Sequence, residues 1–377
     1  MNLSNQQSTA VNNILQWLKT SDKRFVLSGY AGTGKTTIAR ILEDDIGGNV
    51  IYCTLTGKAA NVLRERGCGN TGTIHSYLYK CTGKDENGKL VFVKDPDKKL
   101  RQAGLVVVDE YSMLPQNIIN DLMGCARKVL FLGDPFQLPP VSATQSIEPD
   151  YTLTEIHRQA LDNPVLRAAT AVRNGERLSH CDEGNFVYKY KHKMEKEEFF
   201  NADQCLVGRH DTRKKWNKIF CEHYGFETEF QDNVQKPSGQ GEKIICLKNI
   251  KDQGLFNGMI GTCEDWFLSE GRFHINFKCD GRDYYRLPIF LPPFSFDKSD
   301  MKKKTDNRDL CEFDYAYAIT VHKSQGSEFD NVLIYNEPIG KTHTDRQRWL
   351  YTAITRAKRK AILRAVVVRL PGRLVIW

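Results

Sequence analysis

Apolar residues along the chain change their spacing several times, and each spacing predicts a different element. Between Gln6 and Lys19 they recur every three or four positions, which predicts an amphipathic helix. Phe25 to Leu27 is a short apolar run that ends in a glycine-rich turn, and the stretch from Lys35 to Asp45 is again amphipathic at helical spacing. We therefore expect the chain to open with a helix, a strand, a loop and a second helix.

Further short apolar runs follow, separated by helical or loop sequence. They are Asn49 to Thr54, Leu105 to Val108 and Lys128 to Leu132. Short apolar strands that alternate with helices are typical of a parallel sheet covered by helices, so we predict an α/β fold. The same alternation of short apolar runs with helical sequence returns after about Tyr151. Further elements are predicted at Gln204 to Val207, Asp211 to Tyr224, Asn331 to Tyr335 and Arg348 to Thr355.

A segment of different composition interrupts this second region. Residues 235–310 are rich in Gly, Pro and Lys and carry short β-like runs such as Lys243 to Leu247. Asn257-Gly258 predicts a hairpin turn of type I′, because this pair supplies two positive φ angles at low cost. We predict a small β-rich insertion between residues 235 and 310.

Composition narrows the class of protein. The 377 residues suffice for two domains. The chain is 40% hydrophobic and 27% charged, and it has no apolar run long enough to span a membrane. Met1 to Gln6 shows no signal-peptide pattern. We therefore expect a cytoplasmic protein, in a bacterial or phage-infected cell. The eleven cysteines lack C-x-x-C spacing, so no zinc site is predicted. A net charge of +8 favours a polyanionic partner.

The segment from Gly29 to Thr36 matches the phosphate-binding pattern G-x-x-x-x-G-K-[ST], between a predicted strand and a predicted helix. Its glycines allow backbone N–H groups to surround phosphates, Lys35 supplies positive charge, and the Thr36 hydroxyl is a Mg²⁺ ligand. ATP and Mg²⁺ are therefore the predicted cofactors. The predicted nucleotide-binding residues of this segment are Gly29, Gly32, Thr33, Gly34, Lys35, Thr36 and Thr37.

Two acids, Asp109 and Glu110, directly follow the apolar run Leu105 to Val108. At the end of a buried strand that comes after a P-loop, such a pair is suited to ATP hydrolysis. We predict that Asp109 holds Mg²⁺ and that Glu110 orients and deprotonates the attacking water.

Beyond the P-loop, a series of segments resembles the motifs of superfamily 1 helicases, in that family's order and over nearly the whole chain. The forms T-G-K-A-A, D-E-x-S-M and V-H-K-S-Q-G favour the branch of RecD and Dda. These segments begin at Thr56, Thr73, Asp109, Gly133, Leu153, Ala318 and Leu350.

The resemblance implies an architecture of two RecA-like α/β domains. The first would comprise residues 1–150, with a β-hairpin pin at about 80–101. The second would comprise residues 151–234 and 311–377, and the insertion at 235–310 would be an SH3-like β subdomain.

The resemblance also implies roles at the nucleotide. Arg158 and Arg356 are candidate arginine fingers, which stabilise charge on the transferring phosphate. Gln137 fits a γ-phosphate sensor, and Gln7 resembles a glutamine that contacts adenine. The alternatives are a surface salt bridge for each arginine and a solvated helix residue for Gln7.

Polar residues of three motifs are predicted to hold the nucleic-acid backbone without reading bases. Each hydroxyl also fits a helix cap or a turn, and each histidine also fits a hydrogen-bonded core position. The predicted DNA-binding residues are Thr56, Lys58, Thr73, His75, Phe92, Thr320, His322 and Ser324. Phe92 follows Asn87-Gly88 in the predicted pin, where it would stack on a base; an edge residue packed on its own domain is the alternative.

The implied function is ATP-dependent translocation on single-stranded DNA, in the 5′-to-3′ direction, with unwinding of duplex DNA at junctions. The expected partners are single-stranded DNA, single-strand to duplex junctions, and replication or recombination proteins, with no membrane and with a monomer as the active form. Two alternatives remain open, a superfamily 1 RNA helicase and a P-loop subunit that binds nucleic acid without acting as a motor.

Overall fold

The computed structural model describes residues 3–47, 49–84, 90–139, 147–155, 162–190, 194–226, 229–231, 234–250, 253–294, 310–337, 339–365, 367–370 and 373–376. The chain folds into two compact units. The first comprises Met1–Leu178 and Gly340–Thr355, and the second comprises Ser179–Ile339 and Arg356–Trp377.

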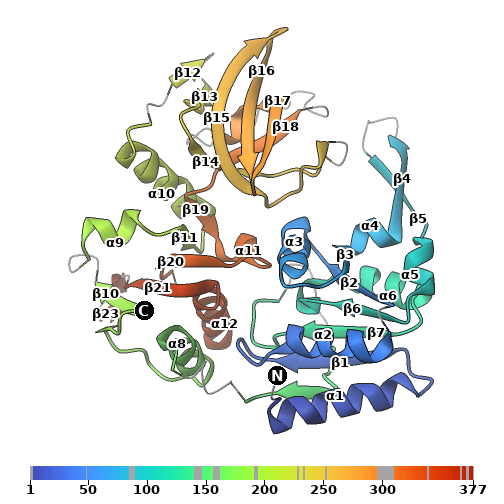
Figure 1. Ribbon diagram of the computed structural model, residues 1–377. Coiled ribbons are helices and arrows are strands. Elements are labelled where there is room, and N and C mark those ends of the chain that lie inside the picture. Colours follow the sequence, from blue (N-terminus) through green and yellow to red (C-terminus); the bar gives the residue numbers. More distant parts are fainter. Residues whose placement is uncertain are drawn as a thin grey trace. The chain divides into compact units, whose positions relative to one another are not determined.

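The first unit is built on a six-stranded sheet in the order β3-β2-β6-β7-β1-β8, in which every neighbouring pair is parallel. Figure 1 shows this sheet with helices on both faces. Its strands are β1 (Arg24–Gly29), β2 (Val50–Thr54), β3 (Asn70–Thr73), β6 (Leu105–Val108), β7 (Val129–Gly133) and β8 (Tyr151–Leu153). The helices of this unit are α1 (Asn5–Leu18), α2 (Lys35–Ile46), α3 (Gly57–Glu65), α4 (Ile74–Leu78), α5 (Lys98–Gln102), η1 (Tyr111–Met113), α6 (Gln116–Cys125), α8 (Pro164–Arg173) and α12 (His343–Ile354).

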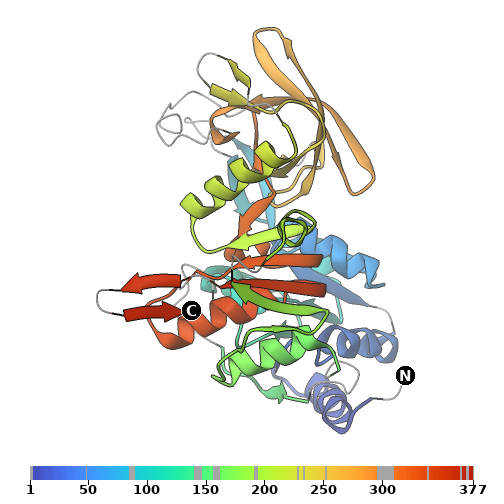
Figure 2. The ribbon, with the colours of Figure 1, turned by 90° about the vertical axis from the view of Figure 1, so that its left-hand side faces the viewer.

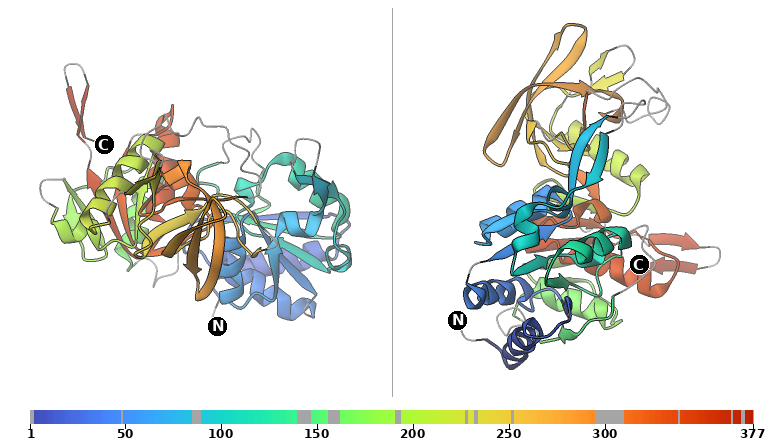
Figure 3. Two further views of the ribbon diagram at one scale, coloured as in Figure 1. Left: turned by 90° about the horizontal axis from the view of Figure 1, so that it is seen from above. Right: turned by 90° about the vertical axis from the view of Figure 1, so that its right-hand side faces the viewer.

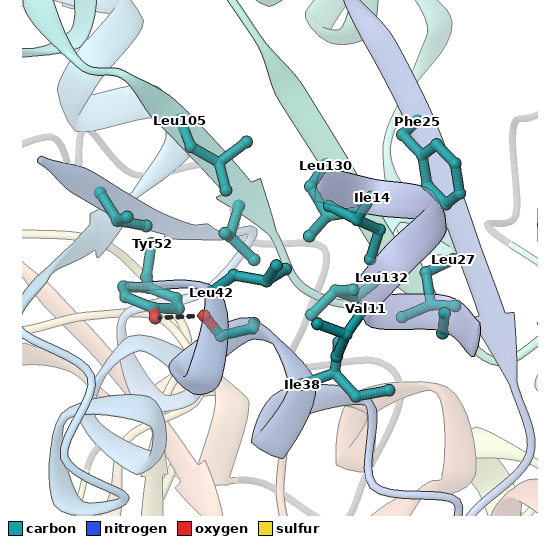
Figure 4. Close-up of a cluster of buried hydrophobic side chains, with 14 of the residues drawn as sticks. Val11, Ile14, Phe25, Leu27, Ile38, Leu42, Tyr52, Leu105, Leu130 and Leu132 are labelled. Atoms are coloured by element: carbon teal, nitrogen blue, oxygen red, sulfur yellow. Dashed lines mark hydrogen bonds between the residues drawn. The ribbon is translucent and has the colours of Figure 1, made fainter. Parts of the chain in front are cut away.

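Apolar side chains of α1 and α2 form the core on one face of this sheet (Figure 4). Ile14, Ile38 and Leu42 are fully buried there and belong to one cluster with Leu27 and Leu130 of the strands. Burying an aliphatic side chain of this size contributes about 1.5–3 kcal/mol. The stripe predicted from the sequence between Gln6 and Lys19 thus becomes the packed face of α1.

The second unit contains another six-stranded sheet, in the order β19-β11-β20-β21-β10-β9 (Figure 2). Its pairs are parallel except for the antiparallel edge pair of β9 and β10. The strands are β9 (Cys181–Asp182), β10 (Phe186–Tyr190), β11 (Gln204–Val207), β19 (Ala318–Thr320), β20 (Phe329–Tyr335) and β21 (Ala357–Ala365), and the helices are α9 (Lys196–Phe200), α10 (His210–His223) and α11 (Val321–Ser324). The two parallel sheets confirm the predicted α/β class.

A closed five-stranded barrel is also part of the second unit, and Figure 3 shows its long strands in orange. Its strands are β14 (Glu242–Cys246), β15 (Ile260–Ser269), β16 (Arg272–Cys279), β17 (Arg282–Phe290) and β18 (Cys311–Tyr315). The other short elements of the unit are β12 (Glu229–Gln231), β13 (Val234–Lys236), η4 (Pro292–Phe294), β22 (Val367–Leu370) and β23 (Arg373–Ile376).

The tight turns of the barrel differ from the predicted one. Glu270-Gly271 and Asp280-Gly281 each join two strands with both residues at positive φ, between 50° and 72°, as a type I′ turn requires. Asn257-Gly258 does form a turn, in which Met259 N–H donates to Phe256 O over 3.1 Å. Only Gly258 has a positive φ there, 98°, so this turn is of type II and the predicted type I′ was wrong.

The boundaries of the two compact units differ from the predicted domain boundaries. β8 lies beyond residue 150 yet pairs with β1, and α12 packs against α8 within the first unit. The fifth barrel strand, β18, lies beyond the predicted end of the insertion at residue 310. The predicted functional domains therefore remain predictions, while compactness groups these segments differently.

None of the helices in the described part of the chain is long and apolar enough to cross a membrane.

Candidate nucleotide and nucleic-acid site

The P-loop connects β1 to α2 at the carboxyl edge of the first sheet. Gly32 and Gly34 have φ angles of 79° and 82°, a region that glycine enters at no steric cost. The Lys35 ammonium donates to the carbonyl oxygens of Gly29 (2.7 Å) and Tyr30 (3.1 Å). The loop is thus wrapped around its own lysine, between a strand and a helix as the sequence predicted.

Gly29 requires a residue without a side chain. A Cβ atom at this position would lie 2.6 Å from Thr33 Oγ1 and 3.0 Å from Leu153 Cβ. The Thr33 hydroxyl is held there because it donates to Tyr30 O over 2.8 Å. Thr36 and Thr37, in the first turn of α2, are partly buried.

Gln7 is buried, with 3% of its surface exposed. Its Nε2 donates to Thr33 O of the P-loop over 3.0 Å, and its Oε1 accepts from Ser4 N–H at the start of α1. The side chain therefore joins α1 to the P-loop, so the solvated alternative does not hold. Its predicted contact with adenine stays a prediction.

Asp109 and Glu110 follow β6 directly. Sheet register aligns Ser28 with Gly133 and Val108 with Phe131, so the P-loop, Asp109 and the loop after β7 all leave the sheet at one edge. Glu110 has φ 55° and ψ 42°, a left-handed conformation that is costly for a residue with a Cβ. Its N–H donates to Asp109 Oδ1 over 3.0 Å. Backbone strain is thus stored at the predicted base.

A buried network that the sequence analysis missed joins the P-loop to the loop after β7. The Tyr351 hydroxyl of α12 donates to Asp134 Oδ2 (2.6 Å) and accepts from Ala31 N–H (2.9 Å). Asp134 Oδ1 accepts from Phe136 N–H (2.9 Å). Burial beside Asp134 raises the pKa of Tyr351 well above its usual value, so the phenol remains a donor at neutral pH. The only sequence signal was that both residues lie inside helicase-like motifs.

A second contact that was not predicted lies on Tyr30 of the P-loop. The Arg173 guanidinium of α8 stacks over the Tyr30 ring at 3.7 Å from its centroid. Such cation–π contacts contribute about 0.5–2 kcal/mol and fix the ring's orientation.

The predicted metal ligands are both hard oxygen donors, as Mg²⁺ prefers. Among the described residues no three His, Cys, Asp or Glu side chains cluster as a metal site. A donor set of the Thr36 hydroxyl and the Asp109 carboxylate fits Mg²⁺, which is usually held by one or two protein oxygens together with substrate phosphates and water.

The remaining predicted nucleotide residues have different outcomes. Arg158 lies outside the described residues. Gln137 is partly buried in the loop after β7, where its N–H donates to Asp134 O (3.3 Å). Arg356 belongs to the second unit, is 5% exposed and donates to Ser327 O (3.3 Å), so it is not a surface salt bridge. The roles of these residues at ATP stay predictions.

Three predicted DNA-binding threonines share one local arrangement, in which each caps the helix after a sheet strand. Thr56 accepts from Ala59 N–H, Thr73 from Ser76 N–H and Thr320 from Lys323 N–H, at 3.2–3.3 Å. The alternative of a helix cap is therefore correct for all three. Because a capping hydroxyl accepts through its oxygen, its hydrogen remains able to donate to a phosphate.

The other predicted DNA-binding residues differ in exposure. His75 is exposed and its ring lies 5.6 Å from the Tyr79 ring, and Lys58 and His322 are partly buried. Burial, together with the nearby His210, lowers the pKa of His322, which favours its neutral form. Ser324 is fully buried and donates to Val321 O, so its hydroxyl does not face solvent.

Phe92 lies on a two-stranded hairpin formed by β4 (Tyr79–Lys84) and β5 (Leu90–Lys94), which Figure 1 shows extending from its own unit. Its surface is 46% exposed, and Val91 and Val93 on either side are 39% and 48% exposed. The predicted Asn87-Gly88 turn lies outside the described residues. The hairpin therefore presents apolar surface to solvent.

Comparisons with known proteins agree with this geometry. Residues 2–189 match the AAA domain family, and residues 315–364 match the UvrD-like helicase C-terminal domain. The ATP-dependent RecD2 DNA helicase of Deinococcus radiodurans is 26% identical over 88% of this chain and 46% of its own length. The ATP-dependent DNA helicase Pif1 of Campylobacter jejuni is 24% identical over 88% of this chain and 86% of its own length.

A solved structure of Bacteroides Pif1 bound to single-stranded DNA matches the fold, with a TM-score of 0.59 and 20% identity over 98% of this chain and 93% of that one. The chain spans between 34% and 46% of the length of three curated relatives, RecD2 among them. The P-loop and acid pair at one sheet edge, the second parallel sheet and these matches agree. The chain belongs to the superfamily 1B helicases.

Proposed function

We propose that this protein is an ATP-dependent DNA helicase that translocates 5′-to-3′ on single-stranded DNA and unwinds duplex DNA with the energy of Mg-ATP hydrolysis. RecD2 and Pif1 are named as ATP-dependent DNA helicases, and the Bacteroides Pif1 structure contains single-stranded DNA. This protein shares the fold of that Pif1 structure, and its own motifs follow the order expected of superfamily 1 helicases.

The left-handed backbone of Glu110 carries the proposal. A non-glycine residue at this φ and ψ costs about 1–3 kcal/mol, and such strain persists where the surrounding structure enforces it, often at active sites. A protein that only bound nucleotide would not need a carboxylate held this way after β6. The strain therefore favours a hydrolysing enzyme over a binding subunit.

Each of the predicted nucleotide-site residues has a separate role in ATP binding and hydrolysis. Backbone N–H groups of the P-loop bind the phosphates, and the Lys35 ammonium exchanges its two carbonyl partners for phosphate oxygens. Thr36 and Asp109 would hold a bound Mg²⁺ ion, which would supply charge stabilisation at the transferring phosphate. Glu110 positions and deprotonates the water, and Gln137 responds to the γ-phosphate. Arg158 and Arg356 are proposed to neutralise charge in the transition state.

The threonine caps of both units support a backbone-binding role on DNA. Thr56 follows β2 and Thr73 ends β3, which are neighbours in the first sheet, and Thr320 ends β19 of the second. Together with Lys58, His75 and His322 they offer donors to phosphates without reading base edges. Contacts of this kind suit a motor that accepts any sequence.

An unwinding assay on matched duplexes with a 5′ or a 3′ single-stranded tail tests the proposal, with Lys35→Ala as the control for ATP dependence. We expect unwinding of the 5′-tailed duplex alone, and ATPase activity that single-stranded DNA stimulates. Stimulation by RNA homopolymers but not DNA would refute the DNA assignment, and unwinding of the 3′-tailed duplex alone would refute the direction. ATP turnover of Lys35→Ala within about tenfold of wild type would refute the assignment of the P-loop lysine.

A further inference from the structure

The hairpin of β4 and β5 needs support from outside itself. It is a two-stranded sheet with no third strand in the described part of the chain. An isolated two-stranded hairpin is marginally stable in water. Val91, Phe92 and Val93 also leave between 39% and 48% of their surface exposed to solvent. A device that presses on DNA would therefore have to be stiffened at its base.

One carboxylate on a neighbouring helix holds both strands of the hairpin. Asp121 of α6 accepts from the Tyr79 hydroxyl through Oδ2 (2.5 Å) and from the Lys94 ammonium through Oδ1 (2.7 Å). Tyr79 is the first residue of β4 and Lys94 is the last of β5, and the two are paired across the hairpin. Asp121 thus fixes the hairpin at the rung closest to the body of its unit.

The contacts with Asp121 are favourable ones. The Asp121 side chain is 30% exposed and Lys94 44% exposed, so the ion pair is partly shielded from water. The Lys94 and Tyr79 hydrogen bonds lower the pKa of Asp121, which is therefore ionised at neutral pH. Hydrogen bonds to an ionised carboxylate are stronger than neutral ones.

Movement at the base of the hairpin is transmitted along β5 to Phe92. Phe92 lies two residues, or about 7 Å, from Lys94 along β5 at the usual rise of about 3.3 Å per residue, so a tilt of about 10° at the base would move Phe92 by roughly 1 Å. A shift of that size changes the offset and spacing of a stacked ring, because favourable aromatic pairs keep their centroids about 4.5–7 Å apart in specific orientations. The position of Phe92 is therefore sensitive to the anchor.

The same anchor also touches a predicted DNA contact. The Tyr79 ring that donates to Asp121 lies 5.6 Å from the ring of His75, at an angle of 39°. His75 is exposed and is one of the residues proposed to hold the strand. Tyr79 therefore connects that contact to the base of the hairpin.

From this geometry we infer that Asp121 is a positioning residue for strand separation: it anchors the β4–β5 hairpin through Tyr79 and Lys94 and so couples movement along the strand to unwinding. This inference rests on the proposed helicase function. The Asp121 carboxylate bonds Tyr79 and Lys94 of the hairpin, so we expect its replacement to leave ATP hydrolysis near wild type.

The test compares Asp121→Ala and Asp121→Asn with the matched control Asn120→Ala. Asn120 is the exposed neighbour of Asp121 on α6, and its side chain bonds Gln116 of the same helix. Base pairs unwound per ATP on a 5′-tailed duplex, ATPase activity stimulated by single-stranded DNA, and melting temperature are measured on the same preparations. Hydrogen exchange at the amides of β4 and β5 reports the anchor directly.

We expect Asp121→Ala to lower base pairs unwound per ATP by about three- to tenfold, the range that loss of one partly exposed ion pair and one charge-assisted hydrogen bond allows. ATPase activity and melting temperature should stay near wild type, hairpin amides should exchange faster, and Asn120→Ala should behave as wild type. Lys94→Met should have little further effect in the Asp121→Ala background.

An unchanged ratio of unwinding to ATP turnover in Asp121→Ala would overturn the inference and leave the proposed function intact. Parallel loss of ATPase activity and melting temperature would also overturn it, because it would mean that Asp121 only stabilises the fold. A wild-type protein that hydrolyses ATP but separates no duplex would instead refute the proposed function, and this role with it.

Discussion

Replacing Tyr351 with phenylalanine removes one oxygen atom from the buried network that joins the P-loop to the loop after β7. The ring remains to fill its space, so no cavity forms. The hydroxyl's donated bond to Asp134 Oδ2 and its accepted bond from Ala31 N–H are both lost. Asp134 is only 4% exposed, so water cannot easily replace the missing donor.

The loss in the free energy of unfolding follows from the two hydrogen bonds that the substitution removes. A hydrogen bond to a charged group contributes about 1.5–3 kcal/mol, and a buried N–H left without an acceptor costs about 1–3 kcal/mol. With partial relaxation we expect the first unit to lose about 2–4 kcal/mol. For a unit of this size about 1 kcal/mol corresponds to roughly 2–4 °C, so its melting temperature should fall by about 5–15 °C.

Calorimetry of Tyr351→Phe and of the matched control Tyr52→Phe tests this reasoning. Tyr52 is equally buried in the same unit, but its hydroxyl bonds Ala39 O and the partly exposed Glu43 carboxylate, which water can reach. We expect the control to lose only about 0.5–1.5 kcal/mol. A coupling energy between Tyr351→Phe and Asp134→Ala below about 0.5 kcal/mol would show that the network does not carry the effect.

Three further outcomes are expected. Glu110→Gln should retain nucleotide binding in titrations while single-turnover hydrolysis slows by roughly 10² to 10⁴, and loss of binding would point to a structural residue instead. Phe92→Ala should reduce duplex unwinding and leave the single-strand-stimulated ATPase and the melting temperature near wild type, because the side chain is 46% exposed; parallel loss of both activities would contradict a separating role. Burial lowers the pKa of His322 in the folded protein below its ordinary value of 6.5. As the pH falls below 6.5, the unfolded chain therefore takes up a proton on His322 before the folded protein does, and the folded state loses stability. The melting temperature of His322→Gln should therefore fall less between pH 7 and pH 5.5, and an unchanged pH dependence would rule this out.

Local sequence was sufficient for the parts of the site that lie on one continuous segment. The P-loop and the acid pair after β6 each combine an apolar strand with the polar residues that follow it, so spacing alone places them. Strands β1, β2, β6 and β7 of the first sheet were predictable for the same reason, because Phe25–Leu27 of β1 and the whole of β6 and β7 are buried apolar runs. Strands β3 and β8, which lack such a run, were not predicted.

Contacts between distant segments were not readable. Tyr351 and Asp134 are 217 positions apart, and Tyr79 and Asp121 are 42 apart, so no spacing rule connects them. β21 was missed because Lys358, Arg359 and Lys360 break the apolar pattern that marks a buried strand. The left-handed conformation of Glu110 was also missed, since glutamate rarely adopts it and gives no sequence signal.

Because segments of the two units alternate along the chain, the order of synthesis on the ribosome determines when each unit can be completed. α12 completes the first unit, yet about 160 residues separate it from Leu178, a delay of roughly 8–30 s at about 5–20 residues per second. Until then the nascent first unit lacks the Tyr351 hydroxyl that bonds Asp134 and Ala31 in the folded protein. β21 emerges later still, although it is the strand that joins β10 to β20. Neither unit can therefore finish folding before its late segment, α12 or β21, has been synthesised.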